Sequence, residues 1–560
     1  MIRRHAASIM TIATRRWIAA ALCVVTTQAR AAEPKLVGHW PLGGDARDHS
    51  AAANHGVTAN TRFATDESAP RGVTIAELDG TTGAVEVRDD PAHAFGTRPF
   101  TIAAWVKLDE SGTDVPGDVL SKYDPVARRG FHLSIVNRTA ATSGQSNWRQ
   151  VEFGIDGGTE PIVTDCGRPG NAVYVTALCV HDGNLYAGTC EPGIDEAGHV
   201  YRYIGGTEWL DCGSPDRANA VSALAVYKGR LYAASAKYRL RGSSLPESPN
   251  ENLGGRVFRY EGNSRWADCG KLGASEAING LVVYGGKLFG SSTYAPAGVF
   301  LYDDATGWTP IGTPEGRRVE ALAVFNGMLW GGAYDAGEIY RYRAADGWKI
   351  VGRLPEVTQT YGLAIHRGRL YASTWPTGSV FRHEADDRWT DCGRLGQEKE
   401  VMAMAVYNGK LYAGTLPLAE VYRYDGDGQW AKVARLDPTP DVTYRRVWSM
   451  VVYQGKLFCG TLPSGHVHSI SAGQCASSDR ELPTGWRHLA AVREAKRLVL
   501  YIDGKQVAER STGDAAALDV TNTAGLHNGA GAHDFFHGRL CDVRLYDGAL
   551  GPNEVRALAE

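Results

Sequence analysis

Seven side chains in the middle of the sequence have the chemistry to bind a polar ligand. They are aromatic rings, guanidinium groups and one carboxylate: Tyr334, Tyr361, Trp375, Trp448, Arg318, Arg446 and Glu320. Aromatic rings offer flat apolar surfaces, and charged neighbours fix a ligand's orientation through hydrogen bonds. This combination suits a sugar or a peptide, so we predict that these residues form a ligand-binding surface.

The sequence lacks the common short motifs of catalytic sites. The chain contains no Gly-x-Ser-x-Gly, His-Glu-x-x-His, Walker loop or Cys-x-x-Cys sequence. These motifs indicate, respectively, a catalytic serine, a catalytic metal site, a phosphate-binding loop and a redox-active cysteine pair. Their absence favours a binding protein over an enzyme, and we name no catalytic residue.

A segment of twelve residues, first seen at Leu178–Thr189, occurs seven times in the middle of the chain. Every copy has a glycine at its turn: Gly183, Gly229, Gly286, Gly327, Gly368, Gly409 and Gly455. These glycines are 41 to 57 residues apart. Such a period is typical of four-stranded β-propeller blades. The repeat therefore predicts a seven-bladed β-propeller over residues 159–470.

The seventh copy has no fourth strand of its own. The first copy ends in the tryptophan-led segment Trp209–Gly213, whereas nothing similar follows Gly465–Ile470. A matching segment, Ile162–Gly167, stands before the first copy instead. We expect this N-terminal strand to complete the last blade, because that pairing would close the ring and remove its free edges.

The ligand-binding candidates fall at one end of the predicted blades. They lie where first strands begin or where second strands end, and these two sets of loops share one face of a propeller. Their residue types also differ between copies that otherwise repeat closely. The alternative is that they are ordinary loop residues that pack against one another. We expect the long segment Ala236–Gly254 to cover this face or to be disordered.

Two flanks remain outside the repeat, residues 33–158 and residues 482–560, with a short polar linker at 471–481. Both flanks contain alternating strand patterns, as in Phe100–Leu108 and Trp486–Arg493. Alternation of apolar and polar residues is typical of strands with one buried face. The flanks are therefore expected to be β-rich as well.

Together the flanks resemble a laminin-G-like, or concanavalin A-like, jelly-roll domain. The first flank carries Gly38–Leu42 and Leu78–Gly80, and the second carries Tyr501–Gly504 and Phe536–Tyr546 in the order of the family's two halves. The resemblance implies an all-β fold in which one concanavalin A-like β-sandwich is interrupted by a seven-bladed, kelch-like β-propeller. Insertion at that point is plausible physically, because the two ends of a ring closed by its own first strand lie close together.

The resemblance also implies a structural calcium ion, because many sandwiches of this family bind one through oxygen ligands. The matching positions are Asp45, Asp48 and Asp542, although Cys541 stands where many relatives carry a second aspartate. The paired acids of the family's glucanases, Glu-x-Asp-x-x-Glu, are absent. The resemblance therefore favours carbohydrate binding over glycan hydrolysis in the sandwich.

The N-terminus has the pattern of a secretory signal peptide over residues 1–32. It carries five arginines, no acidic residue, a short apolar stretch and an Ala-rich cleavage region. Removing those arginines changes the net charge from −3 to −8, which argues against a nucleic-acid partner. No later stretch is long and apolar enough for a transmembrane helix. We expect a secreted, periplasmic or cell-surface protein, with some of its nine remaining cysteines in disulfides.

The favoured prediction is an exported, non-enzymatic recognition protein that binds glycans through the sandwich and the propeller loop face. Two alternatives stay open: a glycan hydrolase or lyase with its site at the propeller centre, and a scaffold for cell-surface protein partners. An enzyme would need several ionisable groups that converge in a deep axial pocket. A recognition protein would instead present a shallow aromatic surface.

Overall fold

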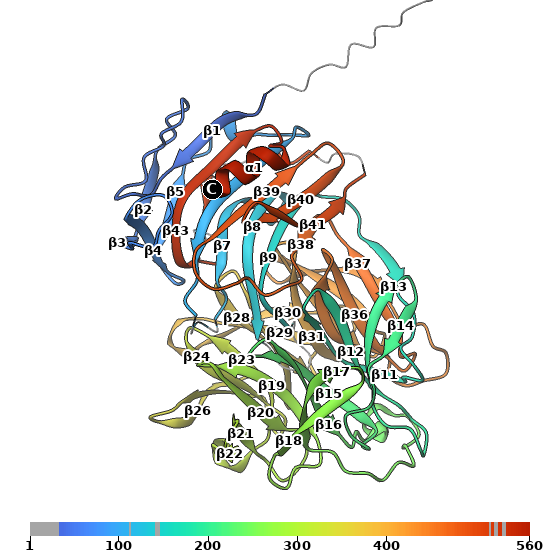
Figure 1. The fold of residues 1–560 in the computed structure, drawn as a ribbon. Coiled ribbons are helices and arrows are strands. Elements are labelled where there is room, and N and C mark those ends of the chain that lie inside the picture. The colour runs from blue at the N-terminus through green and yellow to red at the C-terminus, as the bar shows by residue number, and fades with distance from the viewer. Residues whose placement is uncertain are drawn as a thin grey trace, which may run out of the picture. The chain divides into compact units, whose positions relative to one another are not determined.

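Strands make up almost all of the regular structure (Figure 1). The computed structural model describes residues 33–110, 112, 114–139, 146–513, 517–519, 525–528 and 534–560. The signal peptide that we predict for residues 1–32 lies outside the described residues. Residues 34–560 form one unit. Among the described residues no helix is long and apolar enough to cross a membrane.

The two flanks build a sandwich of two antiparallel sheets. The first sheet consists of β1 (Lys35–Trp40), β3 (Arg62–Thr65), β4 (Thr74–Asp79), β6 (Phe100–Lys107), β39 (Arg487–Arg493), β40 (Arg497–Ile502), β41 (Lys505–Ser511) and β43 (His537–Asp547). The second sheet consists of β2 (Gly56–Ala59), β5 (Ala84–Val87), β7 (Gly117–Asp124), β8 (Arg129–Thr139), β9 (Ser146–Gly157), β38 (Gln474–Ser477) and β42 (Leu526–His527).

Strands from both flanks alternate within each sheet. In the first sheet β6 pairs with β39 on one side and with β43 on the other. In the second sheet β9 pairs with β38. A single apolar core fills the space between the sheets and takes Phe100, Phe131 and Phe153 from the first flank and Leu489 and Leu545 from the second. Neither flank can bury this core alone, so the sandwich is one domain that is split in the sequence.

The inserted segment folds into seven four-stranded blades. Their strands are, for blade 1, β11 (Tyr174–His181), β12 (Asn184–Cys190), β13 (Val200–Gly205) and β14 (Glu208–Asp211); for blade 2, β15 (Ala220–Tyr227), β16 (Arg230–Ala236), β17 (Arg256–Gly262) and β18 (Arg265–Lys271); for blade 3, β19 (Ile278–Tyr284), β20 (Lys287–Ser292), β21 (Val299–Asp303) and β22 (Gly307–Pro310); and for blade 4, β23 (Val319–Phe325), β24 (Met328–Ala333), β25 (Glu338–Arg343) and β26 (Gly347–Arg353). They continue, for blade 5, with β27 (Gln359–His366), β28 (Arg369–Trp375), β29 (Ser379–His383) and β30 (Trp389–Arg394); for blade 6, with β31 (Glu400–Tyr407), β32 (Lys410–Leu416), β33 (Glu420–Gly426) and β34 (Gln429–Arg435); and for blade 7, with β35 (Arg446–Tyr453), β36 (Lys456–Leu462) and β37 (Val467–Ser471).

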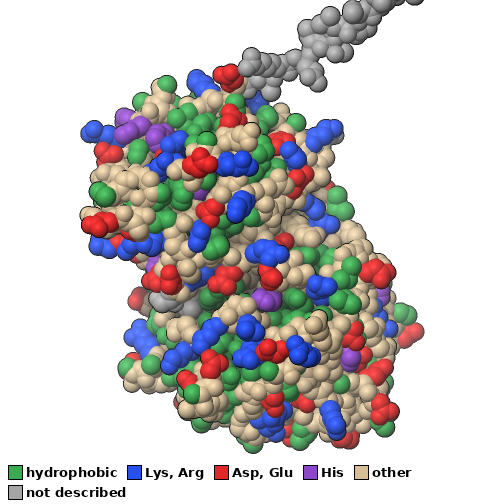
Figure 2. Space-filling view, viewed as in Figure 1, with side chains coloured by type: hydrophobic (Ala, Val, Ile, Leu, Met, Phe, Trp, Pro, Cys, Tyr) green, Lys and Arg blue, Asp and Glu red, His purple; other side chains and the backbone are tan. Residues whose placement is uncertain are grey.

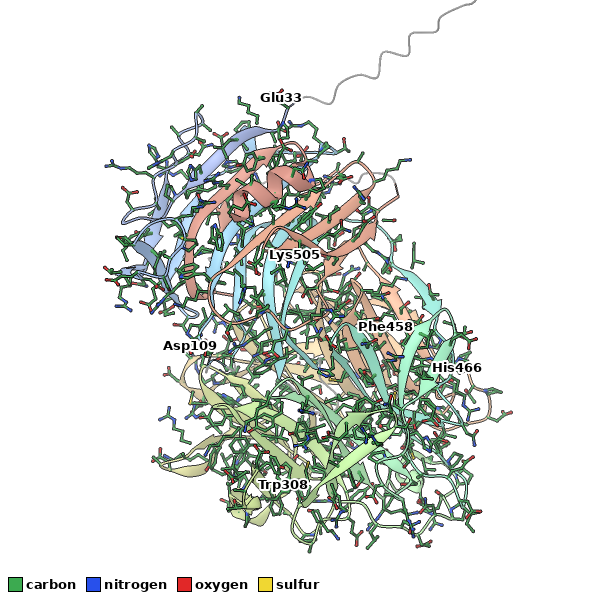
Figure 3. All side chains as sticks on the ribbon, in the orientation of Figure 1. Glu33, Asp109, Trp308, Phe458, His466 and Lys505 are labelled. Atoms are coloured by element: carbon green, nitrogen blue, oxygen red, sulfur yellow. The ribbon has the colours of Figure 1, made fainter. Side chains whose placement is uncertain are left out.

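The predicted closure of the ring is confirmed. The N-terminal strand β10 (Ile162–Asp165) pairs antiparallel with β37 and is the fourth strand of blade 7. His466, labelled in Figure 3, adds a contact from its Nδ1 atom to Asp165 Oδ1 at 3.0 Å. First strands of successive blades lie side by side around the axis, and β35 lies against β11. The ring is therefore continuous.

The repeated Trp-x-Asp-Cys-Gly segments tie neighbouring blades together. Trp266 Nε1 of blade 2 donates to the Cys212 carbonyl oxygen of blade 1 at 2.9 Å, and the equivalent tryptophans of blades 1, 3, 5 and 6 donate to the preceding blade in the same way. The aspartate caps the turn, as Asp211 Oδ1 does by accepting from the Gly213 amide at 2.7 Å. These residues are structural, and the repeated Asp-Cys pairs do not converge on one another.

The hairpin turns at one end of the blades pack on the second sheet of the sandwich. The Gly327 and Gly368 amides donate to Asp114 Oδ2 and Asp534 Oδ1 at 2.9 and 2.7 Å. Asn408 Oδ1 lies 3.2 Å from His132 Nε2, and its Nδ2 atom donates to the Ile155 carbonyl oxygen. As a result His132 on the outer face of this sheet is only 5% exposed. Much of this face is thus an internal docking surface.

Part of the predicted linker is itself a strand. Segment 471–481 contains β38, which extends the second sheet by pairing with β9. Its Ser477 hydroxyl accepts a hydrogen bond from the Gly455 amide in the turn of blade 7, at 2.9 Å. The connection between the domains is therefore bonded on both sides.

The disulfides that we expected are not seen. All nine cysteines among the described residues are free thiols, and eight of them are buried. Charged side chains of both signs are mixed over the face of the molecule in Figure 2, where no large patch of one sign stands out.

Candidate functional site

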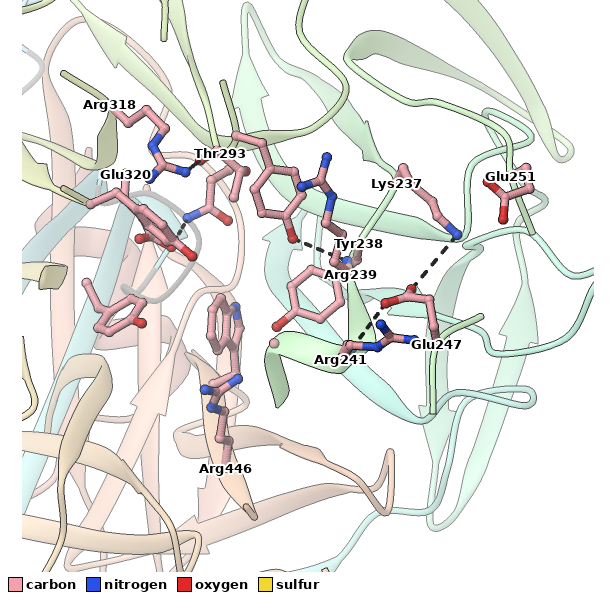
Figure 4. A pocket seen from close by; sticks show the side chains of 16 residues that line it. Lys237, Tyr238, Arg239, Arg241, Glu247, Glu251, Thr293, Arg318, Glu320 and Arg446 are labelled. Atoms are coloured by element: carbon pink, nitrogen blue, oxygen red, sulfur yellow. Dashed lines mark hydrogen bonds and ion pairs between the residues drawn. The ribbon is translucent and has the colours of Figure 1, made fainter. Parts of the chain in front are cut away.

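The axial end of the propeller opposite the hairpin turns contains a cavity of about 740 Å³ (Figure 4). Six of the seven predicted ligand-binding residues line it: Arg318, Glu320, Tyr334, Tyr361, Arg446 and Trp448. Tyr238, Tyr294, Asn279 and Thr293 join them, together with residues of the long segment after β16. The structure thus gathers residues that are up to two hundred positions apart in the sequence.

First strands supply the floor of this cavity. Glu320 is the second residue of β23, Tyr361 the third of β27, and Trp448 the third of β35. In each strand small or apolar residues follow, and these pack around the axis. The side chains at the beginning of the strands are therefore fixed by a rigid scaffold, although they lie at its open end.

Trp375 is the one predicted residue that does not line the cavity. It is the last residue of β28 and is partly buried against the aromatic cluster beneath the face. Its ring contacts Tyr444 edge-on, with 6.5 Å between centroids. The end of β28 lies on the predicted face, but the Trp375 side chain packs against the loop that contains Tyr444 instead of the cavity.

The segment between β16 and β17 forms one wall of the cavity. It begins with the 3-10 helix η2 (Leu240–Ser243) and is held to the rest of the propeller by polar contacts. Arg446 Nη1 donates to the Ser243 hydroxyl at 2.6 Å, and Asn250 Nδ2 donates to the Glu196 and Arg217 carbonyl oxygens. The wall is ordered by these bonds, so we can discard the expectation of a disordered segment.

Aromatic rings cluster at the floor. Trp448 lies edge-on to Tyr174 and Tyr361, with centroids 5.1 and 6.2 Å apart. The Arg318 guanidinium stacks on the Tyr334 ring at 4.2 Å, and that of Arg239 stacks on Tyr294 at 4.6 Å. Burial raises the pKa of Tyr334 to about 12, so its hydroxyl is neutral at physiological pH. The floor offers flat apolar surface with hydrogen-bonding groups at its margins.

Most of the cations around the cavity already have an acidic partner. Arg446 is buried and its Nε atom lies 3.2 Å from Glu400 Oε1. Arg318 Nε donates to Asp335 Oδ1 at 2.9 Å, on the rim. Burial of these ions is tolerable only because each is paired. Glu400 stands behind Arg446 and does not line the cavity.

Glu320 differs from those paired groups. It is 2% exposed, and its Oε1 atom accepts from Asn279 Nδ2 at 2.7 Å, whereas its Oε2 atom has no hydrogen-bond partner among the described residues. Burial raises the pKa of this carboxyl well above its usual range, and the charge of Glu400 adds to the effect, whereas Arg318 and Arg446 oppose it. Glu320 is thus a buried acid that favours the protonated form.

The predicted calcium residues make bonds within the protein. Asp48 accepts three backbone N–H bonds at 2.7 to 2.8 Å, and Asp542 Oδ1 accepts from Arg544 Nε at 2.9 Å and lies 2.8 Å from His39 Nε2. Asp45 is exposed and caps a local turn. The described residues contain no group of three or more His, Cys, Asp or Glu side chains suited to a metal. A calcium ion at Asp48 or Asp542 would have to compete with these bonds for the carboxylate oxygens.

Two groups of residues that line the cavity were not predicted from the sequence. Asn279 and Thr293 are polar residues at strand ends with no distinguishing pattern. Lys237, Arg241 and Glu247 belong to the long segment, whose length was the signal that it could reach across the face. Which of its side chains would line the cavity could not be read without its path.

The sandwich matches a known family over part of the chain. Residues 438–556 match the family described as the concanavalin A-like lectin/glucanases superfamily. The structure places the beginning of this match in blade 7, and the rest in the second flank. This match and the strand topology agree on a concanavalin A-like sandwich that is interrupted by a seven-bladed propeller. No curated protein matches the chain.

Three of the solved structures that are similar to this chain are matched over almost their whole length. A streptogramin B lyase is 9% identical and covers 56% of this chain and 99% of its own, with a TM-score of 0.46. The virginiamycin B lyase of Staphylococcus aureus has the same identity and coverage with a TM-score of 0.45. The WD40 β-propeller domain of Doa1 is 13% identical over 55% of this chain and 97% of its own, with a TM-score of 0.36. Similarities of this size carry nothing about ligand or activity.

Proposed function

We propose that this chain is an exported recognition protein that binds a glycan in the axial pocket of its propeller. The observation that carries the proposal is the cavity floor, where Trp448, Tyr361 and Tyr334 stand beside hydrogen-bonding groups of Glu320 and Asn279. Sugar rings have apolar C–H faces and a border of hydroxyls, and this floor offers partners for both.

The proposal places the ligand on the propeller alone. On the second sheet of the sandwich, propeller turns cover His132 and its neighbours on the outer face. On the first sheet, α1 (Pro552–Ala559) packs over Tyr501 and Tyr546 through Val555. Parts of both sandwich faces are therefore covered within the protein, and the proposal centres on the propeller.

A glycan hydrolase or lyase is the second candidate, and the buried acid Glu320 is the observation that favours it. Two-carboxylate hydrolysis needs a second carboxyl across the scissile bond. Among the described lining residues, Glu247 accepts backbone N–H bonds from the loop, and Glu251 is exposed on the opposite wall (Figure 4). The lining thus offers no second carboxyl held beside Glu320, so binding remains the better-supported function.

Binding is tested with the purified chain on a glycan array, followed by calorimetry with the strongest ligand. Tyr334→Ala removes a cavity side chain at a partly exposed position and should weaken binding at least tenfold, about 1.4 kcal/mol. Tyr284→Ala is the matched control, because Tyr284 is equally half-buried but lies at the hairpin-turn end of β19.

Three outcomes count against the proposal. Equal losses in the two tyrosine variants would mean that the cavity is not the site. Binding of a protein partner without any glycan would favour the scaffold function. Release of shortened or unsaturated products from an oligosaccharide panel would favour the enzyme.

A further inference from the structure

The charges that line the axial pocket nearly cancel. Its cations pair with acids in the lining or directly behind it: Arg318 with Asp335 at 2.9 Å, Arg239 with Glu276 at 3.0 Å, Arg446 with Glu400 at 3.2 Å, and Lys237 with Glu247 at 4.0 Å. The two remaining ions of the lining, Arg241 and Glu251, are exposed and have opposite signs. An acidic ligand that bound at one of these four paired cations would have to displace its acidic partner, which costs binding free energy.

Two polar atoms of the floor have neither a hydrogen bond nor an ion pair to any residue that the structure describes. One is Glu320 Oε2 and the other is Trp448 Nε1, and both belong to buried residues that line the cavity. Buried polar groups are almost always paired, because an unpaired one loses its hydrogen bonds to water without replacement. A ligand that supplies oxygen atoms to both would remove this penalty.

The two cations that face Glu320 are each paired with another acid. The charged and titratable groups that face it are Glu400, Arg318, Arg446, Tyr334 and Tyr361, and both arginines are already paired with other acids. A carboxyl that is buried without a cation takes up a proton, because desolvation penalises its charged form. Its free oxygen then carries the proton and can donate it to a ligand.

From the proposed function, on which this step rests, we infer that the pocket selects an uncharged sugar. We further propose that the protonated Glu320 carboxyl donates a hydrogen bond from Oε2 to an oxygen of that sugar, while Trp448 Nε1 donates a second. A hydroxyl, ring or carbonyl oxygen accepts such bonds, and no charge on the ligand is required. Glu320 is thereby a specificity-determining residue of the pocket.

The ligand class is tested with oligosaccharides that have the same linkage and differ in charge, such as polygalacturonate fragments and their methyl esters of equal length on the same array. We expect neutral fragments to bind at least tenfold more tightly than their uronate or sulfated counterparts. A preference for the charged fragments would overturn the inference and leave the glycan-binding function intact. If no glycan of either class binds, the proposed function fails as well.

The role of Glu320 is tested by Glu320→Gln, whose amide keeps a donor at the same place without titrating. Neutral-sugar affinity of the parent protein should fall as the pH is raised through the elevated pKa of Glu320, because ionised Glu320 loses its donor. The glutamine variant should bind within about threefold of the parent at low pH and should not change with pH. Glu320→Ala should lose tenfold or more while its thermal unfolding stays cooperative.

Two results would contradict this role. Loss of binding in the glutamine variant, combined with parent affinity that does not depend on pH, would mean that Glu320 accepts rather than donates. Unchanged binding in a folded alanine variant would remove Glu320 from the site altogether.

Discussion

Glu152 should make the protein less stable as the pH rises from about 5 to about 8. This residue lies on β9, on the side of the second sandwich sheet that faces the propeller, and is 3% exposed. Burial raises its pKa from 4.5 to about 7, opposed by Arg138 and reinforced by the carboxylates of Asp479 and Asp118. The folded protein therefore holds a proton that the unfolded chain has already released at pH 5 to 7.

The sign and the size follow from that pKa difference. Between the unfolded and the folded pKa the folded state binds more protons, so stability falls with increasing pH across this window. A pKa raised from 4.5 to about 7 corresponds to about 3 kcal/mol of unfolding free energy, fully lost above pH 7. Several buried histidines with lowered pKa, such as His93 and His488, act in the opposite direction, so the parent profile alone is not diagnostic.

The readout is the difference between the parent protein and Glu152→Gln. Urea unfolding of both proteins at about pH 5 and pH 8 gives this difference, because the histidine contributions cancel in it. From about pH 5 to about pH 8, the unfolding free energy of the glutamine variant should rise by about 3 kcal/mol relative to that of the parent. A difference that stays constant within about 0.5 kcal/mol would show that Glu152 is already ionised in the folded protein, and the reasoning from burial would be refuted.

Three further predictions concern the scaffold. Trp266→Phe removes the hydrogen bond to the Cys212 carbonyl oxygen and should lower the unfolding free energy by about 1 kcal/mol, measured by urea denaturation; an unchanged value would mean that the interblade bond contributes nothing. Asn408→Ala breaks the contacts to His132 and to two backbone carbonyls at the docking surface and should cost about 2 to 3 kcal/mol, with Asn326→Ala in the equivalent turn as control. EDTA should leave the Tm unchanged, since the aspartates aligned with the family's calcium ligands are already paired; a fall that added calcium reverses would contradict this.

The fold could be predicted from the sequence to a large extent because its main signals are local and repeated. Each hairpin carries its own turn glycine, and the displaced strand Ile162–Asp165 stood out because blade 7 had none. The disulfides could not be judged in this way. Pairing depends on distances between strands of different blades, and the buried thiols, such as Cys190 and Cys459, end up in separate apolar clusters.

The site was predictable in its location and less so in its chemistry. Strand ends identified the correct face, and six of seven chosen side chains line the cavity. What the sequence could not reveal is which charges pair: Glu320 and Glu400 have the same type and occur at similar strand positions. Only the structure shows Glu400 bonded to Arg446 and Glu320 left without a cation. Trp375 could not be placed for a similar reason, because its ring packs against Tyr444, which is far from it in the sequence.

The nested order of the chain assigns different tasks to the two ends of the propeller. Its chain ends run into β9 and β38 of the sandwich, which forces the sandwich to lie at the end of the blades that carries the hairpin turns. Turns of similar sequence are suitable there, since two of them donate a backbone amide hydrogen bond to an aspartate of the sandwich. The opposite end carries no such constraint, and it is there that the residues differ from blade to blade. Because the sandwich occupies one end of the ring, the axial pocket at the other end is the part of the propeller whose residues can vary to suit a ligand.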